Sequence, residues 1–255
     1  MLIEVGELRR TPYALVLAYP RPEVDVVERR IEELKALGIT HLEFSGRKKI
    51  SGLSVLGKGC VGLVVAARTA EGRKVAVKMR RLDADRDSLA HEAEMLALAN
   101  TVGVGPRLLR HTDDFILMEF IDGPHLPDWL SSKPDPQEVA AVLRALLEKC
   151  RRLDEIGLDH GELSRAHSHV IIQMRADRAP EPRIVDFESA STSRRPANVT
   201  SICQFLFIGG ISAQVAHFLG EADKTAIISA LRAYKRRRGP GEFEGVLRAC
   251  GLSDI

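Results

Sequence analysis

Three glycines and a lysine between residues 56 and 78 have the spacing of a phosphate-binding loop. Gly57, Gly59 and Gly62 fit the pattern G-x-G-x-x-G, and the later run Val-Ala-Val-Lys ends at Lys78. Glycines let backbone N–H groups approach phosphate oxygens without interference from a Cβ, and a lysine ammonium can neutralise phosphate charge. A dinucleotide-binding fold would need a helix directly after the glycines. Here strand-forming residues and a turn at Glu71–Gly72 follow, so we predict a strand–turn–strand hairpin.

A lysine that orients phosphates is usually fixed by a carboxylate, and two glutamates compete for this role. Both lie in the helix predicted after the lysine strand. Glu92 shares a helix face with the apolar Leu96, whereas Glu94 would point away from that face. We therefore predict that Glu92 pairs with Lys78.

A second group of polar residues surrounds a predicted hairpin later in the chain. His160-Gly161-Glu162-Leu163 precedes this hairpin, and Ile184-Val185-Asp186-Phe187-Glu188 closes it. An aspartate at the end of a buried strand is costly unless it pairs or binds a metal. Asp186 is therefore a candidate metal ligand, and Glu162 a candidate proton acceptor.

The elements that must position these residues are predicted from apolar spacing and turn signals. Residues 13–19 fit a strand, residues 24–37 an amphipathic helix and residues 39–44 another strand. Five strands and one helix are predicted between residue 51 and about residue 122. A long helix begins at Asp135, a hairpin covers residues 170–187, and helices dominate from residue 198 onward.

These motifs resemble those of small, atypical members of the eukaryotic-like protein kinases. The chain is similar to RIO-type kinases, to the small kinase of the KEOPS tRNA-modification complex, and to compact predicted serine/threonine kinases from archaea. The resemblance covers about residues 51–207 and is most specific in its first half. It implies an α+β, two-lobed kinase-like fold. An α/β extension would occupy residues 1–50, a strand-rich N-lobe residues 51–121, and a compact, truncated helical C-lobe residues 122–255.

The resemblance also implies sites for ATP and for Mg²⁺ or Mn²⁺. It assigns catalytic roles to Lys78, Glu162 and Asp186, and metal binding to Asp186. Met118 would be the gatekeeper, and the backbone of Glu119 and Ile121 would bind the adenine edge between the lobes. The full set of implied ATP-binding residues is Gly57, Lys58, Gly59, Cys60, Val61, Gly62, Val64, Ala76, Lys78, Glu92, Met118, Glu119 and Ile121.

Three positions depart from the family pattern. Glu162 replaces the catalytic aspartate, and its longer side chain can displace the proton acceptor by about an ångström, a shift that can cost about a hundredfold in rate. His167, or else His169, falls where the family has an asparagine that binds a second metal, and imidazole suits Mn²⁺ or Zn²⁺ better than Mg²⁺. Glu188 replaces the glycine of D-F-G, and no A-P-E motif follows.

The resemblance implies transfer of the γ-phosphate of ATP to a Ser/Thr hydroxyl of a protein substrate. Two alternatives stay open. The first is a nucleotide-binding pseudokinase or ATPase switch that acts through a partner, which the replacements at Glu162 and His167 favour. The second is a small-molecule kinase, which the compact second lobe disfavours. A zinc site formed by Glu162 with His160, His167 and His169 would leave Lys78 and the glycines without a role.

Composition limits the partners and the compartment. The 255 residues are 45% apolar and carry a formal net charge of +2, so neither global disorder nor a general polyanion partner is indicated. The basic run Lys235–Arg238 fits a solvated helix end, with RNA or a ribonucleoprotein as the alternative partner. No apolar run has the length of a membrane span, and the first ten residues lack the order of a secretory signal. The four cysteines are scattered, so we expect reduced thiols in a cytoplasmic protein.

Overall fold

The computed structural model describes residues 1–253 and shows an α+β protein with antiparallel sheets and helices. The chain divides into two compact units. The first contains Met1–Ala97 and Pro106–Phe120, and the second contains Leu98–Gly105 and the residues from Ile121 onward.

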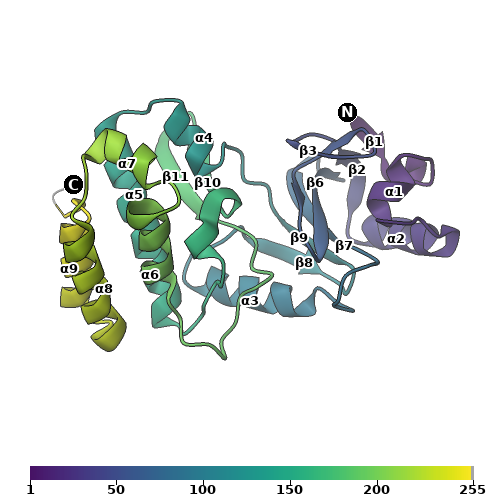
Figure 1. Ribbon diagram of the computed structural model, residues 1–255. Helices are drawn as coiled ribbons and strands as arrows, with labels where there is room; N and C mark the ends of the chain where they lie inside the picture. The colour runs from purple at the N-terminus through teal and green to yellow at the C-terminus, as the bar shows by residue number, and fades with distance from the viewer. Residues whose placement is uncertain (254–255) are drawn as a thin grey trace. The chain divides into compact units, whose positions relative to one another are not determined.

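The first unit is rich in strands (Figure 1). Its elements are β1 (Leu2–Glu4), η1 (Val5–Glu7), α1 (Tyr13–Leu17), α2 (Val24–Ala36), β2 (Ile39–Glu43), β3 (Lys48–Ile50), β4 (Leu53–Val55), β5 (Gly57–Lys58), β6 (Gly62–Thr69), β7 (Lys74–Arg80), β8 (Leu108–His111), β9 (Phe115–Glu119) and most of α3 (Ala90–Thr101).

Seven strands of this unit form one antiparallel sheet. Its order is β1-β2-β6-β7-β9-β8, with β5 paired to β6, and β3 and β4 form a separate hairpin. Five of the seven strands are those predicted after residue 51. The other two, β1 and β2, come from residues 1–50, and the pairing of Leu42 with Ala67 joins them directly to the central strand β6.

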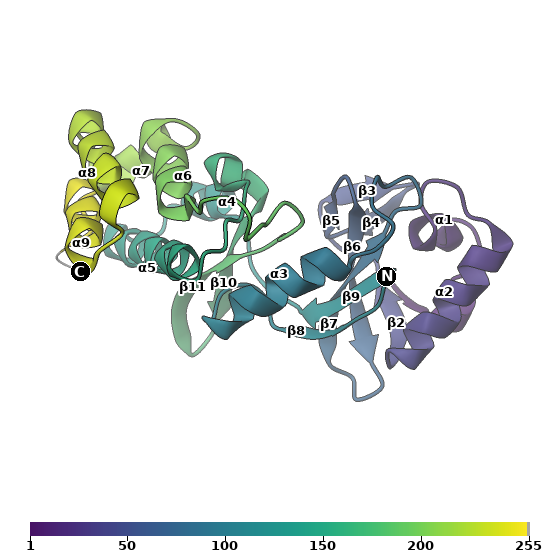
Figure 2. The same ribbon diagram turned by 90° about the horizontal axis from the view of Figure 1, so that it is seen from below.

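Strands β1 and β2 therefore belong to the same sheet as the glycine hairpin, and apolar residues of both regions share one core. Helix α2 packs on β2 and buries Val27, Ile31 and Leu34, as its apolar spacing predicts (Figure 2). Residues 13–19 do not form the predicted strand, because Tyr13–Leu17 is the short helix α1. A short apolar run does not by itself distinguish a strand from a buried helical turn.

A buried carboxylate ties this region to the sheet. Asp114, in the turn before β9, accepts hydrogen bonds from Arg30 at 2.7 Å, from Arg29 at 2.9 Å and from Arg80 at 2.9 Å. The Arg30 side chain is fully buried and also donates to the Leu17 carbonyl oxygen. Burial raises the pKa of Asp114, but hydrogen bonds and charges from Arg30 and Arg80 outweigh it and lower that pKa overall.

The second unit is mostly helical (Figure 1). Its elements are α4 (Leu126–Ser131), α5 (Pro136–Glu155), η2 (Leu163–Ser168), β10 (Val170–Arg175), β11 (Arg178–Ile184), α6 (Asn198–Cys203), η3 (Gln204–Ile208), α7 (Ser212–Leu219), α8 (Lys224–Arg237) and α9 (Pro240–Ala249).

Helix α5 is the central element of this unit and packs against both α6 and β11. Asp135 caps it by accepting a hydrogen bond from the Gln137 backbone N–H, and Pro136 occupies its first turn, as predicted. Strands β10 and β11 form the predicted hairpin, and α8 and α9 pack side by side (Figures 1 and 2).

A second buried carboxylate, Asp154 of α5, organises this unit. It accepts hydrogen bonds from the Asn198 backbone N–H and side-chain amide, both at 2.8 Å, from Val199 N–H at 3.3 Å and from the Tyr234 hydroxyl at 3.1 Å. Burial raises the pKa of Asp154, and the hydrogen bonds from Asn198, Val199 and Tyr234 only partly offset this effect.

Among the described residues, no single helix is both long and apolar enough to cross a membrane. Residues 198–208 and Ser212–Leu219 reach that length and apolar content only when taken together, across a bend of 75°.

Candidate functional site

The glycine hairpin is built as the sequence predicts. Gly57 pairs with Val64 in the β5–β6 ladder, and the turn is closed by a 2.8 Å hydrogen bond from Gly59 N–H to the Gly62 carbonyl oxygen. A Cβ added at Gly62 would lie 2.9 Å from Cε of Lys78. Gly62 therefore gives the stem of the lysine room to pass beneath the turn.

Lys78 forms a buried ion pair with Glu92. Lys78 lies on β7 opposite Val64 and is 2% exposed. Its Nζ lies 2.9 Å from Oε1 and 2.7 Å from Oε2 of Glu92, in the first turn of α3. Glu94 is exposed, so the structure pairs the lysine with the glutamate that the apolar face of the helix favours. Two contacts to one carboxylate fix the direction of an otherwise flexible side chain.

Two segments contact the glycine turn: the residues just after β7 and the N-terminal region. The Arg81 backbone N–H donates to the Val61 carbonyl oxygen at 2.8 Å, and its guanidinium donates to the Gly59 carbonyl oxygen at 2.9 Å. Lys58 Nζ donates to the Tyr19 hydroxyl at 2.8 Å. The Tyr19 ring faces Lys58 Nζ at 4.6 Å and the Arg81 guanidinium carbon at 5.1 Å. The N-terminal region thus reaches the glycine turn.

Cys60 lies at this turn and is exposed, whereas Cys150, Cys203 and Cys250 are buried. Burial raises the pKa of the Cys150 thiol far above its ordinary value. The pKa of the Cys203 thiol is also raised, first by its hydrogen bond with Cys250, which favours the protonated thiol, and then by burial. Cys60 is therefore the accessible thiol among the cysteines of the chain.

The residues predicted to bind adenine lie at the end of β9 and just after it. Met118 pairs with Ala76 of β7, which places two of the predicted ATP-binding residues side by side. The Glu119 N–H donates to the Arg107 carbonyl oxygen at 2.9 Å, so this donor is used within the first unit. Ile121 belongs to the second unit and is buried.

In the second unit, His160 anchors the loop that carries Glu162. Its backbone N–H donates to Oδ1 of Asn198 at 2.9 Å, and Nε2 lies 3.1 Å from the Val185 carbonyl oxygen. A carbonyl only accepts, so Nε2 carries the proton. Burial, followed by the neighbouring His169, lowers the pKa of His160 to about 4, and the imidazole is neutral near pH 7.

Glu162, the predicted proton acceptor, is held by two neighbours. The Ser189 hydroxyl donates to its Oε1 at 2.5 Å, and Nε2 of His169 lies 2.8 Å from its Oε2. Its side chain is 41% exposed, so solvent and ligands can still reach the carboxylate. Gly161 beside it has φ of +89°, and an added Cβ would lie 2.8 Å from the Ser189 carbonyl oxygen. The loop therefore requires glycine at this position.

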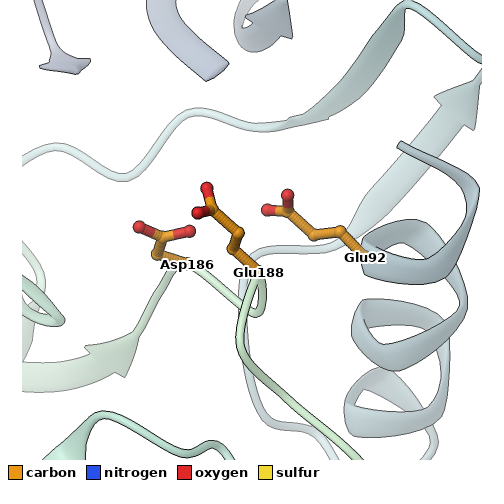
Figure 3. Close-up of side chains that lie close together, drawn as sticks. All are labelled: Glu92, Asp186 and Glu188. Atoms are coloured by element: carbon orange, nitrogen blue, oxygen red, sulfur yellow. The ribbon is translucent and has the colours of Figure 1, made fainter. Parts of the chain in front are cut away.

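Asp186 and Glu188 form a carboxylate pair after β11. A ligand oxygen of each lies within 4.8 Å of the other, and Figure 3 draws both side chains, together with Glu92 of α3. Asp186 has φ of +68°, an uncommon conformation for a residue with a Cβ, and such strain is concentrated at functional sites. Carboxylate oxygens are the ligands that Mg²⁺ and Mn²⁺ prefer, so the donor set fits the predicted metal.

The two histidines predicted as second metal ligands, His167 and His169, have other partners. The His167 ring packs against Phe205 at 4.8 Å between centroids, and His169 contacts Glu162. Within residues 1–253, His160, His167 and His169 do not gather with Glu162 at metal-ligating distances, so the zinc alternative gains no support.

The roles of three residues in this region are not predicted from the sequence. The family resemblance predicts glycine at the position of Glu188, whereas the spacing Asp-x-Glu indicates the carboxylate pair that the structure contains. Ser189 and Asn198 carry no local signal, because their roles depend on partners 27 and 38 residues away.

Each unit thus contributes groups of its own: the glycine turn with Lys78 and Glu92 in the first, and Glu162, Asp186 and Glu188 in the second. No protein-family model matches this chain, and no curated protein matches it either.

Proposed function

We propose that this protein is an ATP-dependent phosphotransferase of the atypical serine/threonine kinase type, similar to RIO-type and KEOPS-associated kinases. The observation that carries the proposal is the buried Lys78–Glu92 ion pair, 2.7 Å long, beneath a turn with the G-x-G-x-x-G spacing. A dehydrated lysine fixed by a carboxylate and covered by a glycine turn is an arrangement suited to phosphate groups.

The order of elements supports a kinase-like fold within this proposal. Along the chain, the glycine hairpin β5–β6, the lysine strand β7, helix α3 and strands β8 and β9 occur in the sequence that the resemblance implies. The hairpin β10–β11, with Glu162 before it and Asp186 after it, also agrees.

Each unit has its own task in the proposed reaction. In the first unit, Lys78 orients the phosphates and the backbone of the glycine turn covers them. In the second unit, Glu162 accepts the proton of the attacking hydroxyl, and Asp186 and Glu188 hold Mg²⁺ or Mn²⁺. A divalent cation neutralises the charge of the phosphates in such reactions. The proposal requires that both units act on the same ATP molecule.

Incubation with labelled ATP and Mg²⁺ or Mn²⁺ tests the proposal directly. Lys78→Ala and Asp186→Ala should each lower the rate of ADP formation and phosphate transfer by about a hundredfold or more. Lys49→Ala and Asp177→Ala remove exposed residues of the same types and should leave both rates unchanged. Wild-type transfer rates in Lys78→Ala and Asp186→Ala, with folded proteins, would overturn the proposed roles.

A second candidate function is a nucleotide-binding switch that transfers phosphate slowly or not at all. The observation that favours it is the engagement of Glu162 by both Ser189 and His169, which leaves the carboxylate with two existing partners. In that case ATP would raise the melting temperature of the wild type but not of Lys78→Ala, and no phosphorylated product would form. Stoichiometric transfer to any hydroxyl would exclude this candidate.

A further inference from the structure

The carboxylate proposed to accept a proton already binds a hydroxyl of its own chain. Oγ of Ser189 donates to Oε1 of Glu162 at 2.5 Å. His169 contacts the other oxygen of the same carboxylate at 2.8 Å and so fixes its orientation. Ser189 is partly exposed, so a reagent can reach its hydroxyl. A general base must lie within hydrogen-bonding reach of the proton that it removes, and this pair meets that requirement.

Ser189 also directly follows the carboxylate pair proposed to hold the metal. Glu188 precedes it in the chain, and Asp186 lies three residues before it. Gly161 packs closely against the Ser189 carbonyl oxygen, so the loop that carries Glu162 lies directly against the backbone of Ser189. The hydroxyl is therefore held at the base, close in the chain to the groups proposed to hold the metal and its phosphates.

A cation lies beside Ser189. Nη2 of Arg194 donates to the Ser189 carbonyl oxygen at 2.6 Å, while its Nε contacts Asp159 at 3.0 Å. A phosphoserine carries a charge of about −1.5 to −2 at pH 7 and is stabilised by a neighbouring guanidinium. The Arg194 guanidinium, which contacts the backbone of Ser189, is therefore the group that would stabilise a phosphate on this residue.

Two other serines of this segment have different partners. Ser191 and Ser193 bond to each other, with their Oγ atoms 2.8 Å apart. They serve as internal controls, because they share the segment and the residue type with Ser189.

We propose that Ser189 is itself an acceptor of the γ-phosphoryl group, so that the protein phosphorylates itself in cis; this inference rests on the proposed function. Oγ of Ser189 forms a bond to the γ-phosphorus, and the bond from that phosphorus to the β–γ bridging oxygen breaks. ADP leaves with the electron pair, and the hydroxyl proton passes to Glu162. The products are phosphoserine and ADP.

The test uses the full chain, first treated with a phosphatase and then incubated with ATP and Mg²⁺ or Mn²⁺. Site-localised mass spectrometry should find one phosphoryl group at Ser189, formed at a rate independent of protein concentration. Ser189→Ala should lose this modification, Ser189→Thr should keep a modified hydroxyl, and Ser193→Ala should behave as the wild type. Thermal melting of each variant checks that it is folded.

A mixing experiment separates transfer in cis from transfer in trans. Lys78→Ala protein mixed with an excess of wild type should stay unmodified at Ser189. Modification of Lys78→Ala in this mixture would overturn transfer in cis.

ADP formation is measured in the same samples, with dephosphorylated casein as an added acceptor. This measurement separates failure of the Ser189 inference from failure of the proposed function. ADP or phosphocasein without phosphate at Ser189 overturns this inference and leaves the proposed function standing. Phosphate on a different residue only also overturns it. The absence of ADP, phosphocasein and phosphoserine overturns both.

Discussion

Asp114 in the first unit and Asp154 in the second are both buried carboxylates, but their partners differ. Asp114 is surrounded by three arginines, whereas Asp154 accepts hydrogen bonds from backbone, amide and hydroxyl donors without formal charge. Their pKa values accordingly shift in opposite directions, downward for Asp114 and upward for Asp154.

The difference shows two ways to hold candidate functional residues in place. The first unit uses charge: the arginines around Asp114 join α2 to β7, the strand that carries Lys78. The second unit uses neutral hydrogen bonds: Asn198 bonds both Asp154 and the backbone of His160. A carboxylate that neutralises buried cations should be harder to remove than one that only accepts neutral donors.

The largest effect is expected for Asp114→Ala. This change leaves the fully buried Arg30 without its carboxylate, and breaking a buried ion pair costs about 3–5 kcal/mol. Chemical denaturation followed by circular dichroism measures the free energy of unfolding. Asp85→Ala removes an exposed aspartate of the same unit and should change it by less than about 0.5 kcal/mol.

Asp154→Ala should cost less, about 3 kcal/mol, because its donors carry no formal charge and the Asn198 side-chain amide keeps the Leu158 carbonyl oxygen as an acceptor. The single tryptophan, Trp129, is buried in α4 of the second unit, so its fluorescence reports unfolding of that unit. Asp177→Ala, at the exposed end of the β10–β11 hairpin, is the matched control. A larger loss for Asp154→Ala than for Asp114→Ala would reverse the comparison.

Gly62 beside Lys78 and Gly161 beside Glu162 allow the two units to be compared in how far each depends on glycine in its backbone. Gly161→Ala should destabilise the second unit by about 2 kcal/mol, because its φ is +89° and the new Cβ would meet a backbone oxygen. Gly62→Ala should destabilise less, since its φ is not in the left-handed region and its Cβ meets mainly the Lys78 side chain, but by displacing that side chain it should weaken ATP binding. Gly157→Ala has a similar φ of +79° with open space, so it measures the backbone strain alone. Equal losses for Gly161→Ala and Gly157→Ala would show that the predicted contact with Ser189 has no effect.

The smallest effect per step of the perturbation is a pH dependence from His160, because it builds up gradually over more than two pH units. Its folded pKa of about 4 lies below its ordinary value of 6.5, so the unfolded chain binds more protons between these values. Stability from this group is present above about pH 6.5 and is lost as pH falls toward 4, by about 1 kcal/mol per pH unit. Trp129 fluorescence across this range measures it, and His160→Gln should flatten the slope while the exposed His217→Gln should not. An unchanged slope in His160→Gln would assign the effect to other groups.

Part of this arrangement could be predicted from the sequence because it depends on local spacing. The glycine hairpin, the lysine strand and helix α5 each have signals within a few residues, and the structure confirms these elements. Glu92 could be preferred over Glu94 because helical periodicity places it on the apolar face.

The rest depends on contacts between distant segments. The strand predicted at residues 13–19 is helix α1, because tertiary packing decides the state of a short apolar run. The arginines around Asp114 join residues 34 to 85 positions apart, and no local pattern indicates such a cluster. The role of Glu188 depends on how the loop after β11 folds, which brings its carboxylate near that of Asp186.

The exposure of Cys60 has a practical consequence. A thiol-reactive fluorophore added to the unmodified protein would attach at the glycine turn, since the other three thiols are buried. The wild-type chain thus offers its own reporter position, at which nucleotide binding could be followed in real time without introducing or removing a cysteine.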